Sequence, residues 1–179
     1  MTQTIAHPVA ADMEIITQAI GWLNQYPSVI LVTVAKTWGS SPRPAGSLLV
    51  INPTTGHYSG SVSGGCIESD LLTRCQQQEF TQFPHRLEYG VATAHNQRLG
   101  LPCGSRLELI LELLDSTTPL EALCYKITQH QPVMRQVCLT TGEVSLHPAT
   151  PNCVFSASPT HLRKPFGLEW QLLLIGAGQ

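Results

Sequence analysis

Residues 28–51, SVILVTVAKTWGSSPRPAGSLLVI, contain two apolar runs separated by a segment rich in glycine and proline. The first run, SVILVTVA, is continuous and β-branched, and the second, SLLVI, is shorter. Apolar runs of this length that are bounded by turn residues are typical of buried β-strands. The segment therefore predicts two buried strands joined by a rigid loop.

Helix and strand patterns alternate along the rest of the chain. Apolar residues at helical spacing predict helices, and short apolar or alternating runs predict strands. Together they predict an α/β fold with a mixed sheet and flanking helices. The helices are expected at residues 12–26, 67–75 and 119–130, and the further strands at 85–91, 106–114, 132–148 (a hairpin) and 152–157.

The composition narrows the class of protein. Only 12% of the 179 residues are charged and the net charge is -2, so neither a nucleic-acid footprint nor a basic membrane-binding patch is expected. The N-terminus lacks the pattern of a secretory signal, and no apolar run is long enough to span a bilayer. We therefore expect a cytoplasmic protein whose six cysteines are free thiols. No paired Cys/His spacing indicates a structural zinc site.

Residues 61–71, SVSGGCIESDL, place a cysteine after two glycines and before a predicted helix. Ile67, Leu71 and Cys75 form the apolar stripe of that helix, and Cys66 falls on roughly the opposite side. Glycines at a helix start let an anion approach the backbone. The partial positive charge at the helix N-terminus also favours the thiolate form of a cysteine over the thiol. Residues 61–67, here called the cysteine loop, thus form a candidate ligand site. A small buried cysteine is the alternative for Cys66.

Two further loops have related features. Residues 101–105, LPCGS, place Cys103 beside Gly104 just before a strand. Residues 39–46, GSSPRPAG, bracket Arg43 with two prolines, and we call them the arginine loop. Proline stiffens the backbone, and a guanidinium suits phosphate or carboxylate, although a solvent-exposed arginine is the alternative. Together the loops predict a pocket for an anionic, sulfur-seeking ligand.

Two partial motifs predict less. GSVSG resembles a nucleophile elbow, but Val62 stands where the hydrolase serine would be. The terminal LLLIGAGQ has a strand followed by Gly176 and Gly178, yet a lone GxG without the following helix does not bind a dinucleotide by itself.

Three segments follow one another along the chain: GSSPRPAGS, SVSGGCIESDL and RLGLPCGSRLELILE. In this order they resemble the N-terminal domain of the XdhC/CoxI family, accessory proteins of xanthine dehydrogenase and related molybdenum hydroxylases. The tail resembles the opening strand and phosphate loop of that family's Rossmann-like second domain. The resemblance implies a first domain over residues 1–165 and, over 166–179, a linker with the start of a truncated second domain.

This resemblance implies a chaperone that binds the molybdenum cofactor (molybdopterin), protects its sulfurated form and inserts it into the hydroxylase, with a cysteine desulfurase as a further partner. The resemblance is also compatible with a homodimer. It implies that NAD(P) or a nucleotide is bound only if the second domain is present. The alternative is a nucleotide-dependent enzyme, either a nucleotidyltransferase or an oxidoreductase. Cys66 and Cys103 are expected to contact molybdenum or its sulfur. The cofactor-binding residues implied are Ser41, Arg43, Gly64, Gly65, Cys66, Glu68, Cys103 and Gly104.

Overall fold

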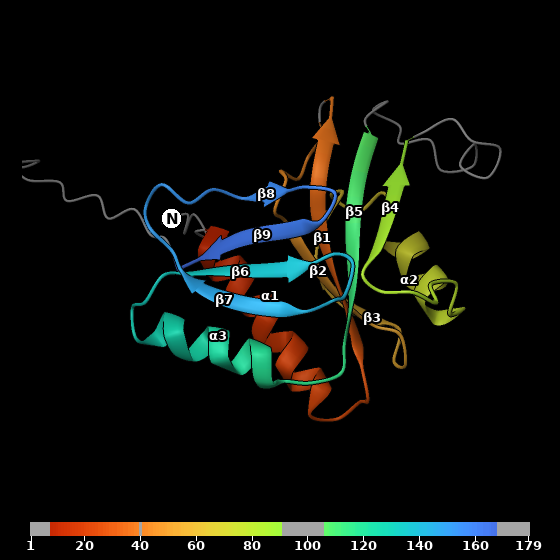
Figure 1. Ribbon diagram of the computed structural model, residues 1–179. Coiled ribbons are helices and arrows are strands. Elements are labelled where there is room, and N and C mark those ends of the chain that lie inside the picture. The colour runs from red at the N-terminus through yellow and green to blue at the C-terminus, as the bar shows by residue number, and fades with distance from the viewer. Residues whose placement is uncertain (1–7, 40, 91–105, 168–179) are drawn as a thin grey trace, which may run out of the picture.

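A computed structural model describes residues 8–39, 41–90 and 106–167 (Figure 1). These residues form three helices and two sheets. Sheet A has the strand order β3-β2-β1-β5-β4, and sheet B has the order β7-β6-β9-β8. The elements are α1 (Pro8–Leu23), β1 (Val29–Trp38), β2 (Leu48–Asn52), β3 (His57–Gly60), α2 (Glu68–Gln76), β4 (His85–Tyr89), β5 (Arg106–Leu114), α3 (Thr118–Thr128), β6 (Val133–Cys138), β7 (Val144–Pro148), β8 (Ser156–Ala157) and β9 (His161–Phe166).

Sheet A has an apolar core on each face. On one face its strands pack against Leu71 and Cys75 of α2. On the other face they pack against Ile16 of α1 and Leu123 of α3. Burial on both faces explains why β1, β2 and β5 read as nearly continuous apolar runs in the sequence.

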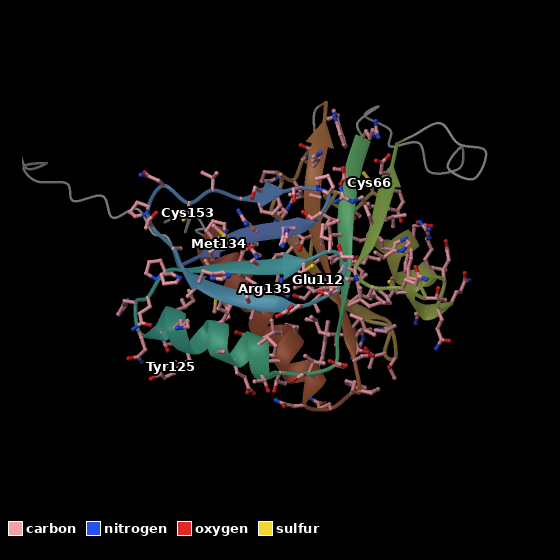
Figure 2. The ribbon with its side chains drawn as sticks, in the orientation of Figure 1. Cys66, Glu112, Tyr125, Met134, Arg135 and Cys153 are labelled. Carbon is pink, nitrogen blue, oxygen red and sulfur yellow. The ribbon has the colours of Figure 1, made fainter. Side chains whose placement is uncertain are left out.

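Sheet B lies across sheet A, and its strands cross those of sheet A in Figure 1. Ile110 of β5 packs against Val137 of β6 and Leu162 of β9. Beside this small core, Nη1 and Nη2 of Arg135 on β6 donate to the two carboxylate oxygens of Glu112 on β5, at 3.1 and 2.7 Å. Both side chains are only 4% exposed, and Figure 2 shows them where the two sheets meet. The sheets are therefore joined by a buried ion pair as well as by apolar contacts.

Lys164 of β9 connects three parts of the chain. Its Nζ lies 2.7 Å from Oδ2 of Asp12 on α1 and donates to the carbonyl oxygen of Gly46 at 2.7 Å. Gly46 is the last residue of the arginine loop, and a Cβ on it would lie 3.2 Å from the ring of Phe155. Sheet B thereby supports the base of the arginine loop.

The predicted α/β class with flanking helices is confirmed. Every pairing between the described strands is antiparallel, and the strands form two sheets rather than one mixed sheet. Short connections such as those between β2 and β3 and between β6 and β7 favour this arrangement, because parallel neighbours need a long crossover.

The sequence did not predict β3 or β9. The β9 sequence HLRKPF has three polar side chains and a proline, and it becomes a strand by pairing with β6 while Leu162 and Phe166 are buried. The strand expected at 152–157 is limited to β8, and Cys153 lies outside it. Residues 168–179, with the predicted second-domain strand and glycine motif, lie outside the described residues.

The arginine loop and the cysteine loop lie at the same end of sheet A. β1 ends at Trp38, which pairs with Arg106 at the start of β5, and the arginine loop follows Trp38 directly. After the arginine loop, β2 begins at Leu48, whose carbonyl oxygen accepts a hydrogen bond from the amide of Ser61 at 3.1 Å. The cysteine loop therefore begins beside the point where the arginine loop ends.

Candidate functional site

The cysteine loop is folded around the carboxylate of Glu68, the first residue of α2. Glu68 is 1% exposed, so its charge lies inside the loop and not on the helix surface. Six hydrogen bonds satisfy it. Oε1 accepts from Ser61 Oγ (2.8 Å), Val62 N (3.0 Å) and Ser63 N (3.0 Å), and Oε2 accepts from Ser63 Oγ (2.5 Å), Gly65 N (3.1 Å) and Ile67 N (3.2 Å).

These bonds determine the charge of Glu68. Burial by itself would raise the pKa of the carboxyl group, because the charged form loses water. The hydrogen bonds from Ser63 and Ser61 outweigh burial and lower the pKa of Glu68 from 4.5 to about 2. Glu68 is therefore ionised at neutral pH.

Cys66 is exposed at the outer side of this loop. Its own amide points inward and donates to Ser63 Oγ at 2.9 Å. Figure 2 shows Cys66 toward the upper ends of the sheet A strands, well above Glu112 and Arg135. The prediction that Cys66 does not belong to the core stripe is confirmed, and Ile67, Leu71 and Cys75 are buried as predicted.

Gly64 and Gly65 are required by the shape of the loop. Their φ angles are +79° and +108°, a region that L side chains rarely adopt. A Cβ on Gly64 would lie 3.1 Å from Cγ of Pro42 in the arginine loop, whereas a Cβ on Gly65 would meet no heavy atom within 4 Å. Gly64 thus allows the two loops to pack together, and Gly65 leaves open space next to Cys66.

The arginine loop contacts the cysteine loop through Arg43. Nε of Arg43 donates to the carbonyl oxygen of Ser61 at 3.2 Å, and the carbonyl oxygen of Arg43 accepts a hydrogen bond from Ser41 Oγ at 3.0 Å. Arg43 is partly buried, and its terminal nitrogens make no hydrogen bond to the described residues. The Nε edge of the guanidinium therefore joins the two loops.

Helix α2 is fixed to sheet A by Tyr89, the last residue of β4. The Tyr89 hydroxyl donates to Asp70 at 2.6 Å and accepts from Nη1 of Arg74 at 3.3 Å. Burial, together with the bond to Asp70, raises the pKa of Tyr89, so the ring stays neutral. Arg74 is in turn paired with Glu79 at 2.6 Å. These bonds hold the start of α2, and with it the cysteine loop, against the sheet.

The other described cysteines differ from Cys66. All five described cysteines are free thiols. Cys75 is 4% exposed, and burial raises its pKa to about 12. Burial also raises the pKa of Cys124, whereas hydrogen bonding by Thr141 lowers the pKa of Cys138, and hydrogen bonding by Thr150 lowers that of Cys153. Cys66 is the only exposed cysteine among the described residues, and its loop contacts the arginine loop.

The second cysteine motif, with Cys103 and Gly104, lies in residues 91–105, outside the described residues. The described residues on each side of it, Gly90 and Arg106, are at the loop end of sheet A, because Tyr89 pairs with Leu107. In the described part of the chain, no three His, Cys, Asp or Glu side chains are close enough to hold a metal ion. The expected contact of Cys66 and Cys103 with molybdenum or sulfur therefore remains a prediction.

Sequence reasoning missed Ser61 and Ser63. Ser61 Oγ accepts from the Gly64 amide at 2.9 Å, and Ser63 Oγ accepts from the Cys66 amide at 2.9 Å. Each serine thus bonds the amide three residues ahead, a local pattern typical of serine before turns and helices. This spacing was the available signal. It also shows that the amides of Gly64 and Gly65, predicted as donors to an anion, are bonded within the loop.

The described part of the chain has no helix of the length and apolar character needed to cross a membrane.

The chain is similar to known proteins in sequence and in fold. Residues 22–90 match the sequence model of the XdhC and CoxI family. Over 115 residues the chain is 30% identical to the molybdenum cofactor insertion chaperone PaoD of Escherichia coli strain K12, a match that covers 64% of this chain and 36% of PaoD. A crystal structure described as a xanthine dehydrogenase from Bacillus halodurans is similar with a TM-score of 0.64 and 18% identity, covering 87% of this chain and 52% of that chain. The second similarity shows a shared fold, and this chain spans only part of both proteins.

Proposed function

We propose that this chain, whose residues 22–90 match the sequence model of the XdhC and CoxI family, binds the molybdenum cofactor and inserts it into a molybdenum hydroxylase. The observation that carries the proposal is the contact between the arginine loop and the cysteine loop. Cys66 supplies an exposed thiol, and Arg43 supplies terminal nitrogens that make no hydrogen bond to the described residues. Their two loops touch at Pro42 and Gly64 and through Arg43 and Ser61.

The chemistry of these side chains suits the cofactor, which carries an anionic phosphate and a metal bound through sulfur. A cysteine sulfur is a soft ligand that contacts molybdenum or its sulfur, and a guanidinium binds phosphate through two parallel donors. In this proposal Cys66 supplies the sulfur contact, and Arg43, positioned by Ser41, supplies the donors. Cys103 with Gly104 supplies a second contact.

Gly64 and Gly65 serve by their lack of a side chain. Their amides are bonded to Ser61 and Glu68, so we assign them the role of keeping the surface beside Cys66 low and open. The lack of any heavy atom within 4 Å of a Cβ on Gly65 supports this role.

The proposed partners and location rest on the similarity to the family. We propose that the hydroxylase is of the xanthine dehydrogenase type, that a cysteine desulfurase supplies the sulfur, and that the protein works in the cytoplasm as a carrier. We also propose that residues 1–165 form the first domain and that residues 166–179 begin a Rossmann-like second domain, where a nucleotide would bind.

The test is retention of isolated molybdenum cofactor by the 179-residue chain, measured as molybdenum that co-elutes with the protein. Wild type is compared with Cys66→Ser, Arg43→Ala and Cys153→Ser. Cys153 is a matched control, because it is a partly buried free thiol on a turn outside both loops.

Retention by wild type and by Cys153→Ser, with loss in Cys66→Ser and weaker retention in Arg43→Ala, is the expected result. A folded wild type that retains no molybdenum would overturn the proposal for this chain. Equal retention by Cys66→Ser would remove the thiol from the site.

A further inference from the structure

The start of α2 is an anion site that the chain fills with its own carboxylate. The amides of Val62, Ser63, Gly65 and Ile67 all point at the two oxygens of Glu68, at 3.0 to 3.2 Å. Converging amides before a helix are the usual means of binding a phosphate or another external anion. Here they are turned inward, and Glu68 is 1% exposed, so an external anion does not reach them.

Cys66 is held by this arrangement on both sides. The amides of its neighbours Gly65 and Ile67 both donate to Oε2 of Glu68, at 3.1 and 3.2 Å. Its own amide donates to Ser63 Oγ, which in turn donates to the same Oε2 at 2.5 Å. Three consecutive backbone amides therefore depend on one carboxylate oxygen, either directly or through one hydroxyl group.

We infer that Glu68 is the positioning residue for Cys66, because its carboxylate is the resident anion of the cysteine loop and keeps the thiol facing outward. Glu68 acts through the loop, and it does not touch a ligand. This inference gives Glu68 a different role from the ligand contact that the family resemblance implies. It rests on the proposed function only in that Cys66 is the contact residue.

The carboxylate can be removed and then supplied again from solution. Glu68→Ala leaves a cavity surrounded by six hydrogen-bond donors, which acetate fits. The experiment attaches a trifluoromethyl label to Cys66 and records its ¹⁹F NMR signal, in a background where Cys103, Cys124, Cys138 and Cys153 are replaced by serine. Cys75 is kept because it is buried.

A single narrow signal is expected for the wild-type loop. Glu68→Ala should give several or broadened signals, and acetate should restore the single signal. Glu121→Ala is the matched control, since Glu121 is an exposed acid in the first turn of α3. The control should keep the single signal and show no response to acetate.

Two results would overturn the inference. An unchanged single signal in Glu68→Ala would show that Glu68 does not position Cys66. Several or broadened signals that acetate does not convert to the single signal, in a protein that remains folded, would show that the carboxylate is not the group that orders the loop.

If Glu68→Ala does not fold, Glu68→Gln and Glu68→Asp take its place. The glutamine keeps the shape but presents an N–H₂ group where an oxygen must accept, so its signal should be disordered. The aspartate keeps the charge and should retain more of the single signal; the reverse order would contradict the inference. Because no cofactor is present in these measurements, they are separate from the cofactor test. A positioned Cys66 in a chain that retains no molybdenum would overturn the proposed function alone.

Discussion

Breaking the ion pair between Glu112 and Arg135 should destabilise the protein strongly. Both side chains are 4% exposed, and two hydrogen bonds of 3.1 and 2.7 Å join them across the interface between the sheets. Glu112→Leu leaves the guanidinium of Arg135 buried without a counter-charge. Removing one partner of such a pair costs about 3–5 kcal/mol of unfolding free energy.

The double variant Glu112→Leu/Arg135→Met should recover most of that loss. It removes both charges together, and buried pairs replaced by apolar residues of similar size are often about as stable as the original. Nε of Arg135 is also buried and has no hydrogen-bond partner among the described residues, so within this part of the chain the wild-type pair carries an unsatisfied donor. The second substitution removes that donor as well.

Urea unfolding followed by circular dichroism measures both effects. With a slope of about 2 kcal/mol per molar urea, Glu112→Leu should lower the midpoint by about 2 M. Glu88→Leu is the control, because Glu88 pairs with Arg106 at 2.7 Å while the two side chains are 37% and 43% exposed. An exposed pair contributes less than about 1 kcal/mol. If Glu112→Leu lowered the midpoint no more than this control, the reasoning from burial would be refuted.

Three further predictions concern the cysteine loop and its surroundings. Iodoacetamide should modify Cys66 of the folded protein within minutes and Cys75 only after unfolding, because Cys75 is 4% exposed and has a pKa of about 12. Mass spectrometry measures modification at both sites, and early modification of Cys75 would contradict its burial. The pKa of Glu68 is about 2 in the folded protein and 4.5 ordinarily, so its ionised carboxylate stabilises the fold by about 3 kcal/mol above pH 4.5, and this stabilisation is lost as the pH falls toward 2. In Glu68→Gln, the unfolding free energy should change less with pH over this range, and the same pH dependence as in wild type would refute the prediction. Gly60→Ala should lower the free energy of unfolding by about 2 kcal/mol or more, because φ of Gly60 is +95° and a Cβ there would lie 2.5 Å from a carbonyl oxygen of β2. Gly21→Ala is the control: a Cβ on Gly21 would meet no heavy atom within 4 Å, so this variant should not lower the melting temperature.

Local patterns were enough to predict four of the five strands of sheet A, all but β3, and the helices that pack on it. The apolar runs of β1 and β2 and the stripe of α2 are signals within a few residues, and each element was found where the pattern indicated. The outward position of Cys66 followed from the same stripe. These features depend on the period of a single element, which a sequence shows directly.

The remaining features depend on contacts between distant residues. β9 is a strand because β6 lies beside it, and the HLRKPF sequence by itself gives no strand pattern. Lys164 reaches Asp12 and Gly46, which no local spacing indicates. An acidic residue at a helix start also occurs on solvated surfaces, so the buried position of Glu68 was visible only in three dimensions.

The order in which strands leave the ribosome has a consequence for sheet A. β1 pairs with β5 along almost its whole length, and β4 also pairs with β5, yet β5 is synthesised after both. The segment that matches the family model ends at residue 90, before β5 begins. Expressed alone, this segment would leave β1 with an unpaired apolar edge, a feature that promotes association with other chains. We therefore expect that the residues matching the family model do not fold as an independent unit, and that a soluble fragment has to extend through Leu114, the end of the strand that pairs with β1.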